Sequence, residues 1–247
     1  MIIKFPLHYA PANEERMIHL YLPDEYHSTD ERYPVIYMFD GHNLFSDSDA
    51  TYGKSWGLKE FLDHWHKRVI VVGMECSHTG HERIKEYCPY QIKSRYTGAV
   101  DGIGDATMQW IVGYVKPFID EKYRTWRHRE ATAIAGSSMG GMMALYGVLH
   151  YNDVFSKAAA VSPAFFKCLP LFVNELSTHP IHPDTRLFMS WGTNEDSHGW
   201  QTKRILKMEA AAQRHGIRTW LYNQQGGRHC EADWEVQVPT WMQFLWL

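Results

Sequence analysis

The chain has 247 residues, of which 45% are hydrophobic and 21% charged, and its formal net charge is −3. This length and composition fit a single globular domain with a sizeable core, and the weak charge gives no reason to expect a nucleic acid or an anionic membrane as partner. Apolar runs long enough to span a membrane are absent, and the first residues lack the pattern of a secretory signal, so we expect a cytoplasmic protein.

Apolar and amphipathic segments alternate along the chain. The opening residues, Met1–His8 and Met17–Leu22, predict an antiparallel hairpin at one edge of a sheet. Short apolar runs predict six further strands, at Val35–Phe39, Arg68–Gly73, Ala131–Ala135, Lys157–Val161, Arg186–Trp191 and Arg218–Tyr222. Segments of helical period lie between them, at Gly57–His66, Ala106–Tyr123, Met139–His150, Thr202–His215 and Ala232–Leu245. This alternation predicts an α/β fold with a mostly parallel central sheet and helices on both faces.

The segment from Glu75 to about Asp105 shows no clear periodicity, but it contains Tyr87, Tyr90, Tyr96 and several glycines. Structureless loops of this length are uncommon in compact domains and are usually functional. The aromatic residues favour a functional loop over a disordered insertion. We therefore predict one domain, residues 1–247, with a lid or pocket wall at about 75–105, and we take the three tyrosines as candidate pocket residues.

The turn from Gly136 to Gly140 reads Gly-Ser-Ser-Met-Gly, and Ser138 stands at its centre. It follows a strand of small residues and opens an apolar helix, which is the setting of the nucleophile elbow in an α/β-hydrolase fold. A side chain at either glycine would collide with the adjoining strand or helix. We predict that Ser138 is a nucleophile and that the Met139 N–H faces the developing oxyanion. The alternative is a tight turn in which a serine, Ser137 or Ser138, caps the helix.

A serine nucleophile needs a base and an acid that orients the base, and in this fold they follow it in the order acid, then histidine. A polar turn after the fifth predicted apolar strand contains Glu195 and Asp196. We favour Glu195 as the acid and keep Asp196 as the alternative. His229 follows the last strand in a glycine-rich loop, so we predict that it is the general base; the alternative is an exposed loop histidine.

A second oxyanion donor is expected from the loop after Val35–Phe39. This loop begins Asp40-Gly41-His42, and Gly41 allows close approach of the backbone. We therefore predict that the N–H of Gly41 or His42 donates to the oxyanion. The alternative is an ordinary Asp-Gly turn.

Cysteine and histidine patterns give no metal signature. The four cysteines form no C-x-x-C pair, so reduced thiols are expected, and none of the closely spaced pairs among the 15 histidines has a metal-binding context. We therefore predict neither a metal nor an organic cofactor. The ten tryptophans are an unusual excess, and those at Trp234, Trp241 and Trp246 are either core residues or a contact in a homodimer.

Several segments together resemble a known family: YPVIYMFDGHNLF at 33–45, HERIKEYCPY at 81–90, VKPFIDEKYRT at 115–125, AGSSMGGMMAL at 135–145, Ser162-Pro163, GTNE at 192–195 and GGRH at 226–229. In these segments the chain resembles the putative-esterase family of α/β-hydrolases. That family includes enterochelin-type, feruloyl and acetylxylan esterases, S-formylglutathione hydrolase and the mycolyltransferases. The family's triad falls on Ser138, Glu195 and His229, and Asp196 stays open because some relatives carry an aspartate as the acid.

The resemblance implies a serine hydrolase that cleaves small-molecule carboxylic esters through an acyl-enzyme intermediate. We expect an intracellular esterase for acylated sugars, siderophore-like lactones or related small esters. The alternatives are an acyltransferase or a thioesterase with the same triad, or a binding protein that kept the fold without the activity.

Overall fold

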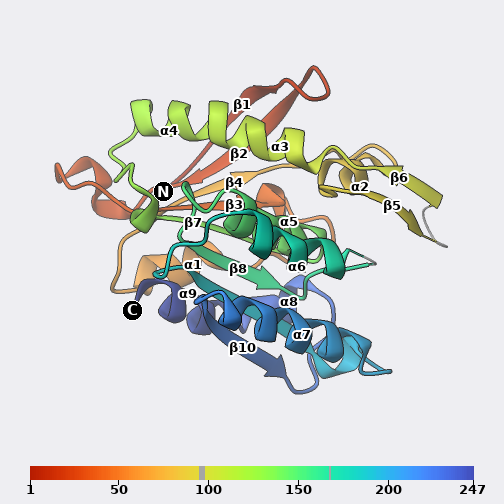
Figure 1. The fold of residues 1–247 in the computed structure, drawn as a ribbon. Helices are drawn as coiled ribbons and strands as arrows, with labels where there is room; N and C mark the ends of the chain where they lie inside the picture. Colours follow the sequence, from red (N-terminus) through yellow and green to blue (C-terminus); the bar gives the residue numbers. More distant parts are fainter. Residues whose placement is uncertain (95–97, 167) are drawn as a thin grey trace.

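An eight-stranded sheet forms the centre of the computed structural model, which describes residues 1–94, 98–166 and 168–247 (Figure 1). The strand order is β1-β2-β4-β3-β7-β8-β9-β10. The strands are β1 (Ile2–Tyr9), β2 (Glu14–Tyr21), β3 (Val35–Phe39), β4 (Ile70–Met74), β7 (Thr132–Ser137), β8 (Lys157–Val161), β9 (Arg186–Gly192) and β10 (Arg218–Gln224). The strands from β4 to β10 pair in parallel, whereas β1 and β2 are antiparallel and β2 joins β4. The predicted mostly parallel sheet with an antiparallel N-terminal edge is confirmed.

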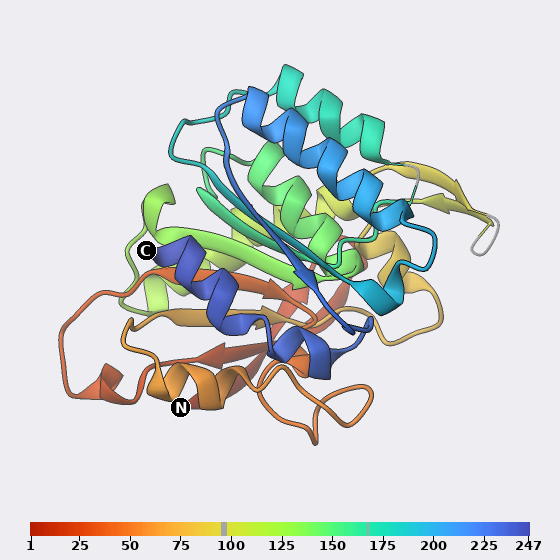
Figure 2. The same cartoon turned by 90° about the horizontal axis from the view of Figure 1, so that it is seen from below.

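Helices cover both faces of this sheet, as Figure 2 shows. They are α1 (Leu58–His64), α2 (Glu82–Glu86), α3 (Gly104–Trp110), α4 (Lys116–Lys122), α5 (Met139–His150), α6 (Leu169–Thr178), α7 (Trp200–Arg214), α8 (Glu231–Glu235) and α9 (Val238–Trp246). Alternate residues of β3 enter different cores: Tyr37 packs in the core that includes α5, α6 and α7, and Ile36 in the core that includes α1 and α9. A strand that is buried on both faces has a continuous run of apolar residues, which is why β3 could be predicted from the sequence. Within the described ranges, every helix is too short or too polar to cross a lipid bilayer.

Two predicted helices are interrupted at prolines. The segment Ala106–Tyr123 consists of α3, a wide π-helical turn at Ile111–Val115, and α4. The wide turn ends two residues before Pro117, whose ring in a regular helix would clash with the carbonyl four residues earlier. The predicted helix Ala232–Leu245 is divided into α8 and α9, because Pro239 fits only the first turn of a helix.

The segment predicted to be structureless has regular structure of its own. It contains α2 and an antiparallel hairpin of β5 (Gln91–Ser94) and β6 (Gly98–Asp101). In Figures 1 and 2 this hairpin projects from the body of the molecule. The expectation of a loop without secondary structure was wrong, and the role of the segment as a lid stays a prediction.

The tryptophans near the C-terminus belong mainly to the core. Trp234 and Trp241 are 4% and 1% exposed, and Trp246 is partly buried against the same core. Buried indole rings offer no surface to a second chain, so the homodimer stays a prediction without support from these residues. All four cysteines are free thiols.

Candidate active site

Ser138 stands in the turn between β7 and α5 with φ 56° and ψ −118°. Such a conformation is strained for a residue with a side chain and persists where its surroundings impose it. The Ser138 N–H donates to the Val161 carbonyl at 2.9 Å, and the Ala164 N–H donates to the Ser138 carbonyl at 2.9 Å. These bonds hold the serine in a sharp strand–turn–helix junction, which is the geometry of a nucleophile elbow.

The glycines of this turn allow backbone contacts that a side chain would prevent. A Cβ added to Gly136 would lie 2.7 Å from the Gly140 carbonyl carbon. One added to Gly140 would lie 2.8 Å from the Phe39 Cβ. Both distances are shorter than real Cβ contacts, so a side chain at either glycine would collide with its neighbours, as the sequence predicted.

The acid and the histidine are adjacent, and only one of the two candidate acids contacts the histidine. The Glu195 Oε2 forms a hydrogen bond with the His229 Nδ1. Asp196 instead accepts the N–H groups of Gln201 and Thr202, each at 2.8 Å, at the start of α7. Asp196 is therefore a helix-capping residue in this structure, and Glu195 is the carboxylate that can orient the imidazole.

The other oxygen of Glu195 has its own partners. Its Oε1 accepts the Gly192 N–H at 2.5 Å and the Ser162 hydroxyl at 2.6 Å. The Ser162 Oγ in turn accepts the Trp234 indole N–H at 3.1 Å, and the Trp234 ring packs edge-on against His229. Burial raises the pKa of Glu195, but the hydrogen bonds from His229, Ser162 and Gly192 outweigh it and leave the pKa below its ordinary value.

Ser162 and Trp234 were not predicted as functional residues. The dipeptide Ser162-Pro163 contributed to the family resemblance, but no role followed from it. Its position next to Glu195 depends on the pairing of β8 with β9, and that of Trp234 depends on how α8 folds back over the sheet.

Ser138 and His229 line one cavity of about 420 Å³ at the carboxyl ends of the parallel strands. Ligands bind at this end of an open α/β sheet. Most of the other lining residues are polar or charged: Asp40, His42, Asn43, Thr51, Ser77, His78, Arg83 and Glu231. The structure therefore brings the predicted serine and histidine to one polar cavity, and the predicted acid contacts that histidine.

The predicted oxyanion loop is a short helical turn, Gly41–Asn43, that begins directly after Asp40. Asp40 has φ 58°, and its carboxylate accepts two hydrogen bonds from the Arg83 guanidinium, both at 2.7 Å. Burial raises the pKa of Asp40, but the adjacent Arg83 holds it below the usual value. The N–H groups of Gly41 and His42 begin the turn and, like the Met139 N–H at the start of α5, have no partner within their own helix.

Two of the three predicted pocket tyrosines, Tyr87 and Tyr90, do not line this cavity. Tyr87 is 2% exposed, and its hydroxyl accepts the N–H of Asp40, the residue directly before the turn Gly41–Asn43. Tyr90 donates to the Glu175 carboxylate at 3.1 Å, and Tyr96 lies outside the described residues. Among the described residues of this segment, the cavity is lined by Cys76, Ser77, His78, Gly80 and Arg83 instead.

Comparisons with known proteins identify a family for this chain and solved structures that share its fold. A family model described as "Putative esterase" matches residues 10–245. The Bacillus subtilis protein YbbA, named there as uncharacterized, is 25% identical over 187 residues, which are 73% of this chain and 69% of that protein. An IroE-like serine hydrolase from Shewanella oneidensis superposes with a TM-score of 0.79 at 18% identity, over 98% of this chain and 79% of that one.

The enterobactin esterase FES from Shigella flexneri superposes with a TM-score of 0.78 at 15% identity, over all of this chain and 59% of that one. At such identities the two structures establish the shared fold, while the family model covers the elbow and the loops that carry Glu195 and His229. The chain therefore belongs to the putative-esterase family of α/β-hydrolases and is a carboxylic ester hydrolase.

Proposed function

We propose that the protein hydrolyses small-molecule carboxylic esters through an acyl-enzyme intermediate on Ser138, with His229 as general base and Glu195 as the acid that orients it. The observation that carries this proposal is the contact between Glu195 and His229 at the edge of the cavity that Ser138 lines. A catalytic triad is recognised by the geometry and roles of its residues rather than by their sequence positions.

In the first half of the reaction, the His229 Nε2 takes the hydroxyl proton as the Ser138 Oγ attacks the ester carbonyl carbon. The N–H groups of Met139 and of Gly41 or His42 stabilise the negative charge on the carbonyl oxygen. His229 then gives its proton to the leaving alcohol as the tetrahedral intermediate collapses. Water repeats the same steps on the acyl-enzyme and releases the acid, while Glu195 holds the imidazole by its Nδ1–H throughout.

The substrate class follows from the walls of the site. Charged and hydrogen-bonding side chains dominate the cavity, and burying a long acyl chain against them would leave their polar atoms without partners. A second cavity of about 340 Å³ adjoins Glu195 and His229 and is lined by Trp200 and Arg204. We propose that a compact polar ester, such as an acylated sugar, occupies these two spaces, with short acyl groups preferred.

The triad is tested by Ser138→Ala, assayed on short p-nitrophenyl esters and with a fluorophosphonate probe. We expect turnover to fall by about 10⁴-fold or more, with loss of labelling. Ser137→Ala is the matched control, because it removes the neighbouring hydroxyl and leaves the proposed nucleophile available to the probe. Unchanged turnover in Ser138→Ala would refute the assignment.

The substrate class is tested separately with the wild-type protein. We expect acetylated sugars and short acyl esters to be hydrolysed faster than long-chain p-nitrophenyl esters, with a siderophore-type trilactone as a third class in the same screen. A preference for long-chain esters would contradict the polar-substrate proposal but would leave the triad intact.

A further inference from the structure

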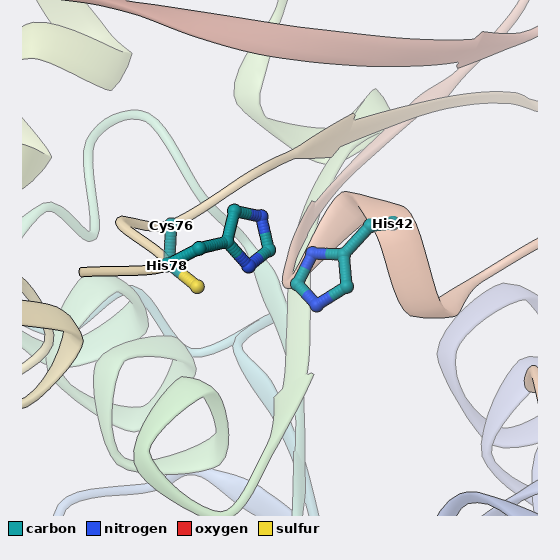
Figure 3. A group of neighbouring side chains, drawn as sticks. All are labelled: His42, Cys76 and His78. Carbon is teal, nitrogen blue, oxygen red and sulfur yellow. The ribbon is translucent and has the colours of Figure 1, made fainter. Parts of the chain in front are cut away.

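Three side chains that can bind a metal converge on the wall of the Ser138 cavity (Figure 3). His42 belongs to the oxyanion turn, whereas Cys76 and His78 follow β4. One ligand atom from each lies within 4.8 Å of the other two. Imidazole nitrogen and thiolate sulfur are the ligands that Zn²⁺ prefers in proteins.

One ring nitrogen of His42 has a hydrogen-bond partner and the other has none among the described residues. Its Nε2 lies 2.9 Å from the Thr51 hydroxyl oxygen, whereas its buried Nδ1 has no hydrogen-bond partner. The residue is only 6% exposed, so water does not readily solvate that nitrogen. With the proton on Nε2 and donated to Thr51, the lone pair of Nδ1 is free, and in Figure 3 this side of the ring faces His78.

His78 likewise has a polar partner at its Nε2. Its Nε2 lies 3.4 Å from the Glu75 Oε2, and the other Glu75 oxygen accepts a hydrogen bond from the buried His19 at 2.6 Å. A carboxylate that holds the outer nitrogen of a histidine fixes its tautomer and strengthens the other nitrogen as a metal ligand. Both histidines are therefore prepared to present Nδ1 to an ion.

We propose that His42, Cys76 and His78 bind one Zn²⁺, and that the fourth coordination position opens into the cavity of Ser138. Three protein ligands with one open position distinguish such a site from a closed structural zinc site. The Cys76 thiol gives up its proton to solvent when the sulfur–zinc bond forms. Asp40 does not compete for the ion, because its carboxylate is held by two hydrogen bonds from Arg83.

The three ligand atoms need to move only a little to coordinate one Zn²⁺. Ligand atoms around a tetrahedral Zn²⁺ lie about 3.5 Å apart, so the cluster has to contract slightly from its present spread. The His78 side chain is 57% exposed and its ring already lies edge-on to the His42 ring, with 4.6 Å between the centroids, so a small rotation turns it toward the other two ligands. The triad needs no metal for ester cleavage, so this site goes beyond the proposed function and departs from the sequence-based expectation of no metal.

The experiment is a titration of the reduced, chelator-treated full chain with Zn²⁺, followed by calorimetry and by competition with a chromophoric chelator. We expect one ion per chain, and an affinity that falls by about a hundredfold or more in Cys76→Ser and in His78→Ala. Glu75→Gln should weaken binding by about 10- to 100-fold, as expected for the partner of a ligand. Co²⁺ in place of Zn²⁺ should give a thiolate-to-metal absorption band that Cys76→Ser lacks.

Matched controls separate this site from other thiols and imidazoles. Cys230→Ser and His81→Ala remove the same groups outside the cluster and should leave the affinity within about threefold of the wild type. Ser138→Ala should bind Zn²⁺ normally, so failure of the hydrolase proposal and failure of this one are distinguishable. Circular dichroism confirms that each variant is folded.

Two results would overturn the proposal. One is the absence of stoichiometric binding, or equal affinity in Cys76→Ser and Cys230→Ser, which would leave an adventitious ion only. The other is binding that is lost in His150→Ala, because it would place the ion at the cluster of His150, Glu175 and His179.

Discussion

Glu195 and Asp196 follow β9 as neighbours, but their carboxylates have different partners. Sequence reasoning favoured Glu195 but kept Asp196 as an alternative, because both are acids in one polar turn. In the structure, Glu195 faces His229, whereas Asp196 faces the first N–H groups of α7. The backbone conformation of the turn sets these directions, and the sequence does not show it. The serine and histidine were easier to predict, since a glycine-flanked elbow and a loop after the last strand leave few alternatives.

Substitution of each acid by its amide should separate the two roles. Glu195→Gln should lower kcat by about 10⁴-fold, since an amide no longer holds the imidazole in the required tautomer. Asp196→Asn should retain most of the turnover and lose less than about 1 kcal/mol of stability, because asparagine caps a helix nearly as well as aspartate. Kinetics on a short p-nitrophenyl ester and urea unfolding of both variants provide the measurement. Equal losses of turnover would contradict the assignment of Glu195.

At the scale of elements, the strands of the central sheet were predictable, whereas the hairpin of β5 and β6 and several short helices were not. The segment around α2, β5 and β6 shows no period because each element has only four or five residues. Helix α6 was not predicted, since Pro170 reads as a break although it lies in the first turn, where a missing N–H costs nothing. These elements nevertheless shape the site, because α2 carries Arg83.

Arg83 holds Asp40, which directly precedes the turn Gly41–Asn43. We propose that this turn supplies an oxyanion donor, so removal of Arg83 should affect catalysis. Arg83→Met leaves the buried Asp40 carboxylate unpaired in its left-handed conformation, so we expect kcat to fall by about 10- to 100-fold with a smaller change in KM. Arg83→Lys keeps the charge but loses the two-point contact and should recover only part of the activity. Lys85→Met, on the same helix, is the control. A change in KM alone would contradict a positioning role.

At the scale of the whole molecule, the parallel sheet brings the loops after β3, β7, β9 and β10 to one edge. The order of strands and helices along the chain was enough to predict this, because right-handed crossovers leave few arrangements. The walls of the cavity were not predictable in the same way. They combine side chains from the oxyanion turn, the segment after β4 and α8, whose meeting depends on packing rather than on any local pattern.

Asp40 and Glu231 are the carboxylates of this wall, and the fold disfavours the charged form of Glu231. Burial raises its pKa, and among the described residues its carboxylate accepts a long hydrogen bond from the Asn43 amide at 3.4 Å. A group with a raised pKa contributes stability while it is protonated and loses that contribution as pH rises through its folded-state pKa. Glu195 and Asp40 have lowered pKa values and act in the opposite sense, so their contribution is lost as pH falls.

Glu231→Gln should therefore stabilise the protein at neutral pH, where the wild type buries a poorly compensated carboxylate, and should have little effect at acid pH, where the wild-type side chain is protonated. The free energy of unfolding in urea, measured for both proteins from acid to neutral pH, tests this directly. Asp233→Asn on the same helix is the matched control: its carboxylate has a lowered pKa and accepts hydrogen bonds from Arg228, so its loss should not stabilise the fold. A Glu231→Gln variant that is less stable than the wild type at neutral pH, and equally so in acid, would show that the Glu231 carboxylate is compensated by partners other than Asn43.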